Sequence, residues 1–136
     1  MSLIIIGSDV MKFLNIRYKE TLFNLDFKNT VNMIVDKSGT GKTFLISMIV
    51  DYCIENNIPY AHLDYKHRDT PLEGKEVLLF DNSDLYFNNE LLNKVKSLNK
   101  FTVVVIKNTL GLDIDDMVSK YYLVNDGYSI VTRERG

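Results

Sequence analysis

The sequence has one cysteine, no long hydrophobic run and almost no excess of charge. Cys53 alone cannot form an internal disulfide, so a disulfide framework is excluded as the basis of the fold. It lies in an apolar stretch, where a buried thiol is more frequent than a nucleophile. No segment approaches the roughly 18 apolar residues of a membrane span, and the apolar run at residues 3–6 is too short for a signal peptide. We therefore expect a cytoplasmic protein without membrane contact.

The charge balance also argues against a general affinity for nucleic acid. The formal net charge is −2, charged residues make up 25% of the chain, and hydrophobic residues make up 46%. This is the balance of an ordinary globular domain, and it supplies no overall positive field, although a local basic patch stays possible. The length of 136 residues suits one domain with a sizeable core. We expect a single domain over residues 1–136.

Hydrophobic patterns divide the chain into a β-rich beginning, residues 1–30, and a region in which strands and helices alternate. Helices are predicted at 44–54, 84–100 and 113–120. Runs rich in apolar or β-branched residues predict strands at 3–6, 11–19, 21–27, 31–35, 58–65, 76–80, 101–106, 121–124 and 128–132. This order predicts an α/β fold with a mainly parallel sheet and a small antiparallel N-terminal addition. Because the helix at 44–54 is apolar almost all round, we expect the main sheet and the N-terminal strands to cover it on both sides.

A glycine-containing loop separates the strand at 31–35 from the helix at 44–54. The loop sequence matches G-x-x-x-x-G-K-[ST] at every defined position except the first and reads Asp36-Lys37-Ser38-Gly39-Thr40-Gly41-Lys42-Thr43. Main-chain N–H groups at such a strand–loop–helix junction form a cradle for phosphate, and glycine lets the backbone approach the oxygens. We expect Lys42 to reach the β- and γ-phosphates and the Thr43 hydroxyl to bind Mg²⁺. The alternative is a glycine-containing turn with an ordinary solvated lysine.

This motif and its context resemble the P-loop NTPase superfamily, and the resemblance covers most of the chain. It implies a three-layer α/β fold with the phosphate strand in the centre of the sheet. It also implies that nucleotide is bound by Lys37, Ser38, Gly39, Thr40, Gly41, Lys42, Thr43 and Phe44. Asp36 departs from the family pattern, because a carboxylate replaces glycine and adds negative charge near the phosphates. The departure leaves open whether nucleotide binding is tolerated, weakened or altered.

A second motif resembles a Walker B strand. Four apolar residues at 77–80 end in Asp81, the residue type that holds magnesium in this superfamily, usually through water. One predicted strand lies between the two motifs in the sequence. The alternative role for Asp81 is to cap the following helix, a role for which Asn82, Ser83 and Asp84 compete.

The order of the motifs resembles the additional-strand division of P-loop proteins. There the next strand inserts between the two Walker strands and ends in a polar sensor residue. Residues 101–106 fit the inserted strand and Asn108 the sensor, with a turn asparagine as the alternative. The resemblance therefore implies Lys42, Asp81 and Asn108 as catalytic residues and Thr43 and Asp81 as magnesium ligands.

The glutamate that normally follows the Walker B aspartate is absent, because position 82 is asparagine. An amide orients water but is a poor proton acceptor. Water activation would then fall to Asp84, Glu90 or Asp64, or hydrolysis is slow or missing.

The β-rich beginning resembles the N-terminal subdomain of ABC-type ATPases, in which an aromatic residue stacks on adenine. Tyr18 is the candidate, and an edge-strand tyrosine is the alternative. No L-S-G-G-Q signature occurs, and the Walker spacing is too short for the helical insertion that carries it. A true ABC ATPase is therefore not expected.

Three further groups have weaker signals. Arg133 and Arg135 are candidates for completing a neighbouring copy's active site, although tail arginines are usually solvated. His62 and His67 flank Asp64; zinc binding is disfavoured, and strand alternation favours a hydrogen bond between His62 and Asp64. The acidic residues at 113–116 are typical of a helix N-terminus rather than of a metal site.

Together these patterns predict a protein that binds a purine nucleoside triphosphate with Mg²⁺. ATP is favoured over GTP because no N-K-x-D motif occurs. We expect slow ATP hydrolysis coupled to a protein partner or to a homo-oligomer, with nucleic acid possible as a partner but not indicated by charge. The alternative is a degenerate, non-hydrolysing P-loop module that serves as a regulatory or interaction subunit. A kinase is disfavoured because residues 65–75 are too few for a basic lid.

Overall fold

A computed structural model describes most of the chain. The described residues are 2–6, 9–18, 21–27, 29–35, 42–125 and 129–134. For part of these the main chain alone is described, including residues 2–18, 42–43 and 129–134.

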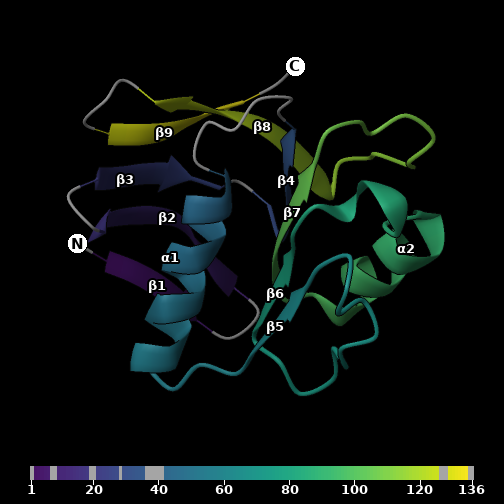
Figure 1. Ribbon diagram of the computed structural model, residues 1–136, viewed down its shortest axis with the longest axis horizontal. Helices are drawn as coiled ribbons and strands as arrows, with labels where there is room; N and C mark the ends of the chain where they lie inside the picture. Colours follow the sequence, from purple (N-terminus) through teal and green to yellow (C-terminus); the bar gives the residue numbers. More distant parts are fainter. Residues whose placement is uncertain are drawn as a thin grey trace.

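The described residues form one nine-stranded sheet with helices on its faces (Figure 1). The strands are β1 (Ser2–Ile6), β2 (Asp9–Tyr18), β3 (Thr21–Asp26), β4 (Val31–Val35), β5 (Tyr60–Leu63), β6 (Val77–Phe80), β7 (Phe101–Ile106), β8 (Val118–Asn125) and β9 (Ser129–Glu134). The helices are α1 (Lys42–Glu55), the 3₁₀ turn η1 (Ser83–Leu85) and α2 (Asn89–Leu98). The strand order is β1-β2-β3-β9-β8-β4-β7-β6-β5.

Five neighbouring strands, β8, β4, β7, β6 and β5, run parallel to one another. They make up one end of the nine-stranded sheet, with β5 at its edge, and confirm the predicted α/β fold with a mainly parallel sheet. β7 lies between β4 and β6, as the motif order predicts. β1, β2 and β3 pair antiparallel, as predicted for the N-terminal addition, and β8 and β9 form the predicted final hairpin. The addition joins the rest of the sheet through the parallel pairing of β3 with β9.

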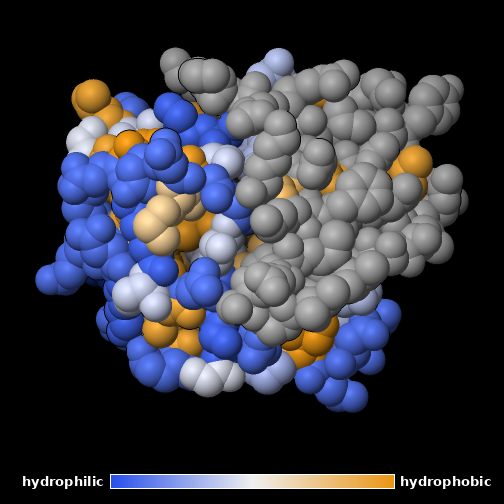
Figure 2. Space-filling view, turned by 180° about the vertical axis from the view of Figure 1, so that it is seen from behind, coloured by the Kyte–Doolittle hydropathy of each residue, from blue (hydrophilic) through white to orange (hydrophobic). Residues whose placement is uncertain are grey.

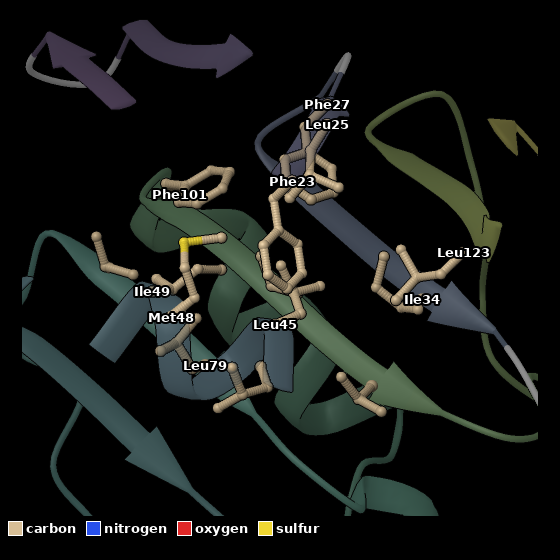
Figure 3. Packing of buried hydrophobic residues seen from close by; sticks show 14 of the residues in the cluster. Phe23, Leu25, Phe27, Ile34, Leu45, Met48, Ile49, Leu79, Phe101 and Leu123 are labelled. Atoms are coloured by element: carbon tan, nitrogen blue, oxygen red, sulfur yellow. The ribbon is translucent and has the colours of Figure 1, made fainter. Parts of the chain in front are cut away.

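Helix α1 packs between the parallel strands and the N-terminal strands, as its all-round apolar sequence predicts. One buried cluster holds Leu45, Met48 and Ile49 from α1 together with Phe23 from β3 and residues of β4, β6, β7 and β8. Figure 3 shows side chains of β3, α1 and β7 pointing into this common core. The N-terminal strands extend the sheet beyond the parallel strands, and together they cover the apolar helix α1.

Helix α2 lies on the other face of the parallel strands, opposite α1 (Figure 1). Its Leu92 and Val95 belong to a second buried cluster with residues of β4, β5, β6 and β7. The core is split into two clusters because successive side chains of β7 point to opposite faces of the sheet. The α1 cluster takes Phe101, Val103 and Val105, and the α2 cluster takes Val104 and Ile106. Both faces of the parallel strands are therefore apolar, as buried parallel sheets require.

Two predicted helices differ from the structure. The helix predicted at 84–100 begins only at Asn89, because Asn88 has extended backbone and its side chain accepts a hydrogen bond from the Leu91 N–H. The helix predicted at 113–120 is wrong. Asp115 instead accepts a hydrogen bond from the Met117 N–H in a local turn, and β8 begins at Val118 beside β4. Such local aspartate hydrogen bonds compete with helix formation.

Hydrophobic groups on the described surface are scattered. On the face seen in Figure 2, the described part shows small separate hydrophobic groups among hydrophilic residues. Among the described residues, no helix combines the length and apolarity that a membrane span requires.

Cys53 is buried in the α1 cluster, and burial raises the pKa of its thiol from 9.0 to about 11. We expect its reaction with a thiol reagent near pH 8 to be on the order of 100-fold slower in the folded than in the unfolded protein, because both burial and the low thiolate fraction oppose attack. Absorbance-monitored labelling with and without guanidinium measures this. Rapid native labelling would contradict the burial of Cys53.

The same shift links stability to alkaline pH. Between pH 9 and pH 11 the Cys53 thiol ionises in the unfolded protein but stays protonated in the folded protein, which favours unfolding. The free energy of unfolding is therefore at its full value below pH 9 and falls by about 2–3 kcal/mol as the pH rises toward 11.

Candidate functional site

The carboxyl ends of β4, β5, β6 and β7 meet at one edge of the parallel sheet. In the register, Val35 pairs with Ile106 and Phe80 pairs with Val104. Because only β7 separates β4 from β6, the ends of these two strands are about 10 Å apart, two strand spacings. β4 and β6 therefore both end at the same edge of the sheet, which is the edge where ligands of open α/β sheets bind.

Helix α1 begins at Lys42, and six residues separate it from Val35 at the end of β4. The intervening residues 36–41 and the side chains of Lys42 and Thr43 lie outside the described residues, so the expected roles of this loop stay predictions. The first turn of α1 contains no acidic residue. The positive end of the helix dipole is therefore not offset by a carboxylate within that turn, which favours an anion. Phe44 places its ring 5.7 Å from that of Phe23.

Asp81 follows β6 at this edge, on the side of the sheet that carries α1. Val77 and Leu79 belong to the α1 cluster, and alternation carries Asp81 to the same face. Its side chain is 22% exposed. The Asp81 N–H donates to the Leu63 carbonyl oxygen at 2.9 Å, which ties the end of β6 to the end of β5.

Tyr86, which directly follows η1, reinforces this tie. Its hydroxyl donates to the carbonyl oxygens of Asp81 at 2.9 Å and Leu63 at 3.2 Å. Burial, followed by the negative charges of Asp81 and Asp64, raises the pKa of Tyr86 well above its usual value. The hydroxyl therefore stays protonated and remains a hydrogen-bond donor. The main chain of Asp81 is held by two hydrogen bonds, one from its N–H to Leu63 and one to its carbonyl oxygen from Tyr86.

The structure brings the side chain of His62 of β5 close to Asp81. Its Nε2 lies 4.0 Å from Oδ2 of Asp81, is buried, and has no hydrogen-bond partner within the described part of the chain. Sequence reasoning did not pair these residues, because it placed His62 beside Asp64. Predicting the His62–Asp81 pair requires both strand alternation and the register of β5 against β6. Only the tertiary structure supplies that register.

Asp64 pairs with His67 rather than with His62. Its Oδ1 accepts hydrogen bonds from the main-chain N–H groups of Lys66 and His67 and lies 2.9 Å from Nδ1 of His67. Burial alone would raise the pKa of Asp64, but these hydrogen bonds outweigh it and hold the pKa below its ordinary value. A carboxylate with a lowered pKa is a weak proton acceptor, which disfavours Asp64 as a base.

The other candidates near this edge are mostly engaged in local structure. The Asp84 carboxylate accepts hydrogen bonds from the N–H groups of Lys107 and Asn108. The side-chain oxygen of Asn108 accepts a hydrogen bond from the Leu110 N–H at 2.8 Å, and its expected sensor role stays a prediction. Asn82 is exposed, with left-handed backbone at φ 50°. Glu90 is exposed in the first turn of α2, on the opposite face of the sheet from Asp81.

An open hollow of about 390 Å³ lies beside these turns. It is lined by Tyr65, Asn82, Asp84, Leu85 and Lys107. The hollow shows that the edge next to β6 and β7 is accessible from solvent.

Two distant candidates are located by their main chains alone. Tyr18 ends β2 opposite Thr21, two positions from the pair Ile16–Phe23. Since the Phe23 ring contacts Phe44 in the first turn of α1, the end of β2 lies toward the start of that helix. Arg133 pairs with Tyr122 in the β8–β9 ladder, and Arg135 lies outside the described residues.

The donor chemistry at the edge fits magnesium. Mg²⁺ typically takes one or two carboxylates, with phosphates and water completing its octahedral shell. Asp81 supplies one partly exposed carboxylate at the edge where the loop after β4 begins. Among the described residues, no group of three or more His, Cys, Asp and Glu side chains lies together as a closed metal site. Comparisons of the chain with protein-family models, with curated proteins and with solved structures gave no match.

Proposed function

We propose that the chain is a three-layer P-loop nucleotide-binding domain that binds a purine nucleoside triphosphate, ATP in preference to GTP, together with Mg²⁺. The observation that carries the proposal is the position of β7 between β4 and β6. This order puts the end of β4 and Asp81 at one edge of the sheet, and α1 and Asp81 lie on the same face of that sheet.

Each group at this edge has a chemical role in the proposal. The main-chain N–H groups of the loop and of the first turn of α1 surround the phosphates, and the Lys42 ammonium group neutralises their charge. Phe44 contributes its N–H, since its ring packs on Phe23. Thr43 and Asp81 would hold Mg²⁺, which offsets the negative charge of the phosphates when bound. Tyr18 supplies a surface on which the purine stacks.

Hydrolysis is slow in this proposal, because no described carboxylate at the edge is well suited to accept a proton from water. Asn82 replaces the glutamate, while Asp84 and Asp64 are occupied by main-chain hydrogen bonds. The same observation favours a second candidate function, a module that binds nucleotide without turnover and presents a nucleotide-dependent surface to a protein partner.

Thermal unfolding with nucleotide tests the proposal. A ligand present at 100 times its Kd stabilises the folded state by about 2.7 kcal/mol, which for a domain of this size corresponds to a rise in Tm on the order of 10 °C. We expect ATP with Mg²⁺ to give this rise, GTP to give a smaller one, and ATP in EDTA to give less than ATP with Mg²⁺.

The control is AMP at equal concentration, which lacks the β- and γ-phosphates. Equal Tm with and without millimolar ATP and Mg²⁺ would overturn the proposal. Phosphate release measured on the same samples separates slow hydrolysis from binding alone.

A further inference from the structure

His62 has an environment that ordinary core packing does not explain. Its Nε2 is buried and has no hydrogen-bond partner among the described residues, although Oδ2 of Asp81 lies only 4.0 Å away. Leaving a buried polar atom unpaired costs about 1–3 kcal/mol. The ring is nonetheless not sealed in the core, because the His62 side chain is 33% exposed.

The main chain fixes where His62 and Asp81 stand. In the β5–β6 ladder His62 pairs with Leu79, and Asp81 is two residues further along the same face. The Asp81 N–H and the Tyr86 hydroxyl both bind the Leu63 carbonyl oxygen, so the two strand ends cannot separate without losing these hydrogen bonds. The 4.0 Å between Nε2 and Oδ2 exceeds an ordinary N–H···O hydrogen-bond distance by about 1 Å.

We propose that His62 is the positioning residue of Asp81. In its Nε2–H form, His62 donates to Oδ2 and restricts the carboxylate to one orientation toward the magnesium ion. The metal part of this inference rests on the proposed function, whereas the contact between the two side chains does not. Partners that orient a metal-binding carboxylate in this way typically change metal affinity 10- to 100-fold when removed.

A second histidine–carboxylate pair in the chain provides an internal control. Nδ1 of His67 lies 2.9 Å from Oδ1 of Asp64, but the His67 side chain is 70% exposed and the pair holds a turn after β5. The chain contains only these two histidines. A general effect of removing a histidine should therefore appear in both, and an effect specific to Asp81 should appear at His62 alone.

The first experiment measures how much Mg²⁺ tightens ATP binding, as the ratio of the Kd in EDTA to the Kd in Mg²⁺, by titration calorimetry. The variants are His62→Leu, which has no donor, His62→Gln, whose amide nitrogen reaches the position of Nε2, and His67→Gln. We expect the ratio to fall 10- to 100-fold in His62→Leu, to stay within about threefold in His62→Gln, and to be unchanged in His67→Gln. Binding in EDTA should be unchanged in all three.

A purely structural role would give a different pattern. His62→Leu would then weaken ATP binding equally with and without Mg²⁺, or leave the ratio at the wild-type value. Either result would overturn the proposal. So would a ratio of the Kd in EDTA to the Kd in Mg²⁺ that differs from wild type by more than about threefold in His62→Gln.

The second experiment needs no nucleotide. Long-range ¹H–¹⁵N spectra of the His67→Gln variant at about pH 8, where histidine is ordinarily neutral, contain imidazole signals of His62 alone. We expect the Nε2–H tautomer and a change in the Nε2 signal on Asp81→Asn, but not on Asp64→Asn. The Nδ1–H tautomer, or a signal insensitive to Asp81→Asn, would overturn the contact itself.

The two experiments separate the two proposals. Wild-type protein that binds ATP with a magnesium effect, combined with an unaltered ratio in His62→Leu, would overturn the role of His62 alone. Wild-type protein that binds no ATP would overturn the proposed function and with it the metal role, while the spectra still decide whether His62 positions Asp81.

Discussion

Replacing Lys42 by alanine is expected to weaken ATP binding 10- to 100-fold. A hydrogen bond to a charged group contributes about 1.5–3 kcal/mol, and about 1.4 kcal/mol corresponds to a factor of ten in affinity. At an ATP concentration 100 times the wild-type Kd, a variant with 100-fold weaker binding keeps only about 0.4 kcal/mol of ligand stabilisation. The rise in Tm should therefore fall from on the order of 10 °C to 1–2 °C.

The matched control is Lys94→Ala, which removes the same charge from a half-exposed position on α2. Its ion pair with Glu73 is at the surface and contributes little to stability. Thermal scans of wild type and both variants, with and without ATP and Mg²⁺, measure the difference. Lys42→Ala protein that responds to ATP as strongly as wild type would contradict the assignment of the loop, and any phosphate release should also be lost in this variant.

Replacing Phe27 by alanine is expected to lower the free energy of unfolding by about 3–5 kcal/mol. Phe27 is 0% exposed and follows β3, where its ring packs against Phe101 of β7 at 5.7 Å and edge-on against Tyr121 of β8 at 5.5 Å. It therefore joins the N-terminal strands to the parallel strands across the α1 cluster. Since total stability is typically about 5–15 kcal/mol, this single change should remove a third or more of it.

Denaturation by guanidinium measures the loss from the midpoint and the slope. Phe27→Leu, which keeps an apolar side chain, should cost less than about 1.5 kcal/mol. Leu110→Ala, at a residue that is 89% exposed, should change stability by no more than about 0.5 kcal/mol. A loss below 1 kcal/mol for Phe27→Ala would mean that the N-terminal strands are not part of the same cooperative core.

Much of the fold is readable in the sequence because burial imposes simple patterns. The mainly apolar runs of β4 and β7 are buried on both faces and match their predicted bounds. Because α1 is apolar almost all round, it was expected to be buried on both sides. Phe23 of β3 and Phe101 of β7 belong to the cluster that buries it. The insertion of β7 between β4 and β6 was expected only from the resemblance to the additional-strand P-loop proteins, and the strand order agrees with it.

The failures occurred where short polar side chains choose between local structures. The acidic residues at 113–116 resemble a helix start, but Asp115 binds the Met117 N–H and the Lys96 ammonium group, and the chain then enters β8. The helix predicted at 84–100 begins only at Asn89, because the Asn88 side chain accepts a hydrogen bond from the Leu91 N–H. In each case a tertiary neighbour or a turn outweighed a local preference of a few tenths of a kcal/mol.

The sequence by itself determined where most of the strands lie, that residues 36–41 separate a strand from a helix, and that Asp81 follows an apolar strand. These features depend on patterns within a few residues of one another. The turn after β5 pairs Asp64 with His67, three residues away, instead of with His62. Only the tertiary structure decided that His62 faces Asp81, because the side-chain neighbours across a sheet depend on register between strands that are distant in the sequence.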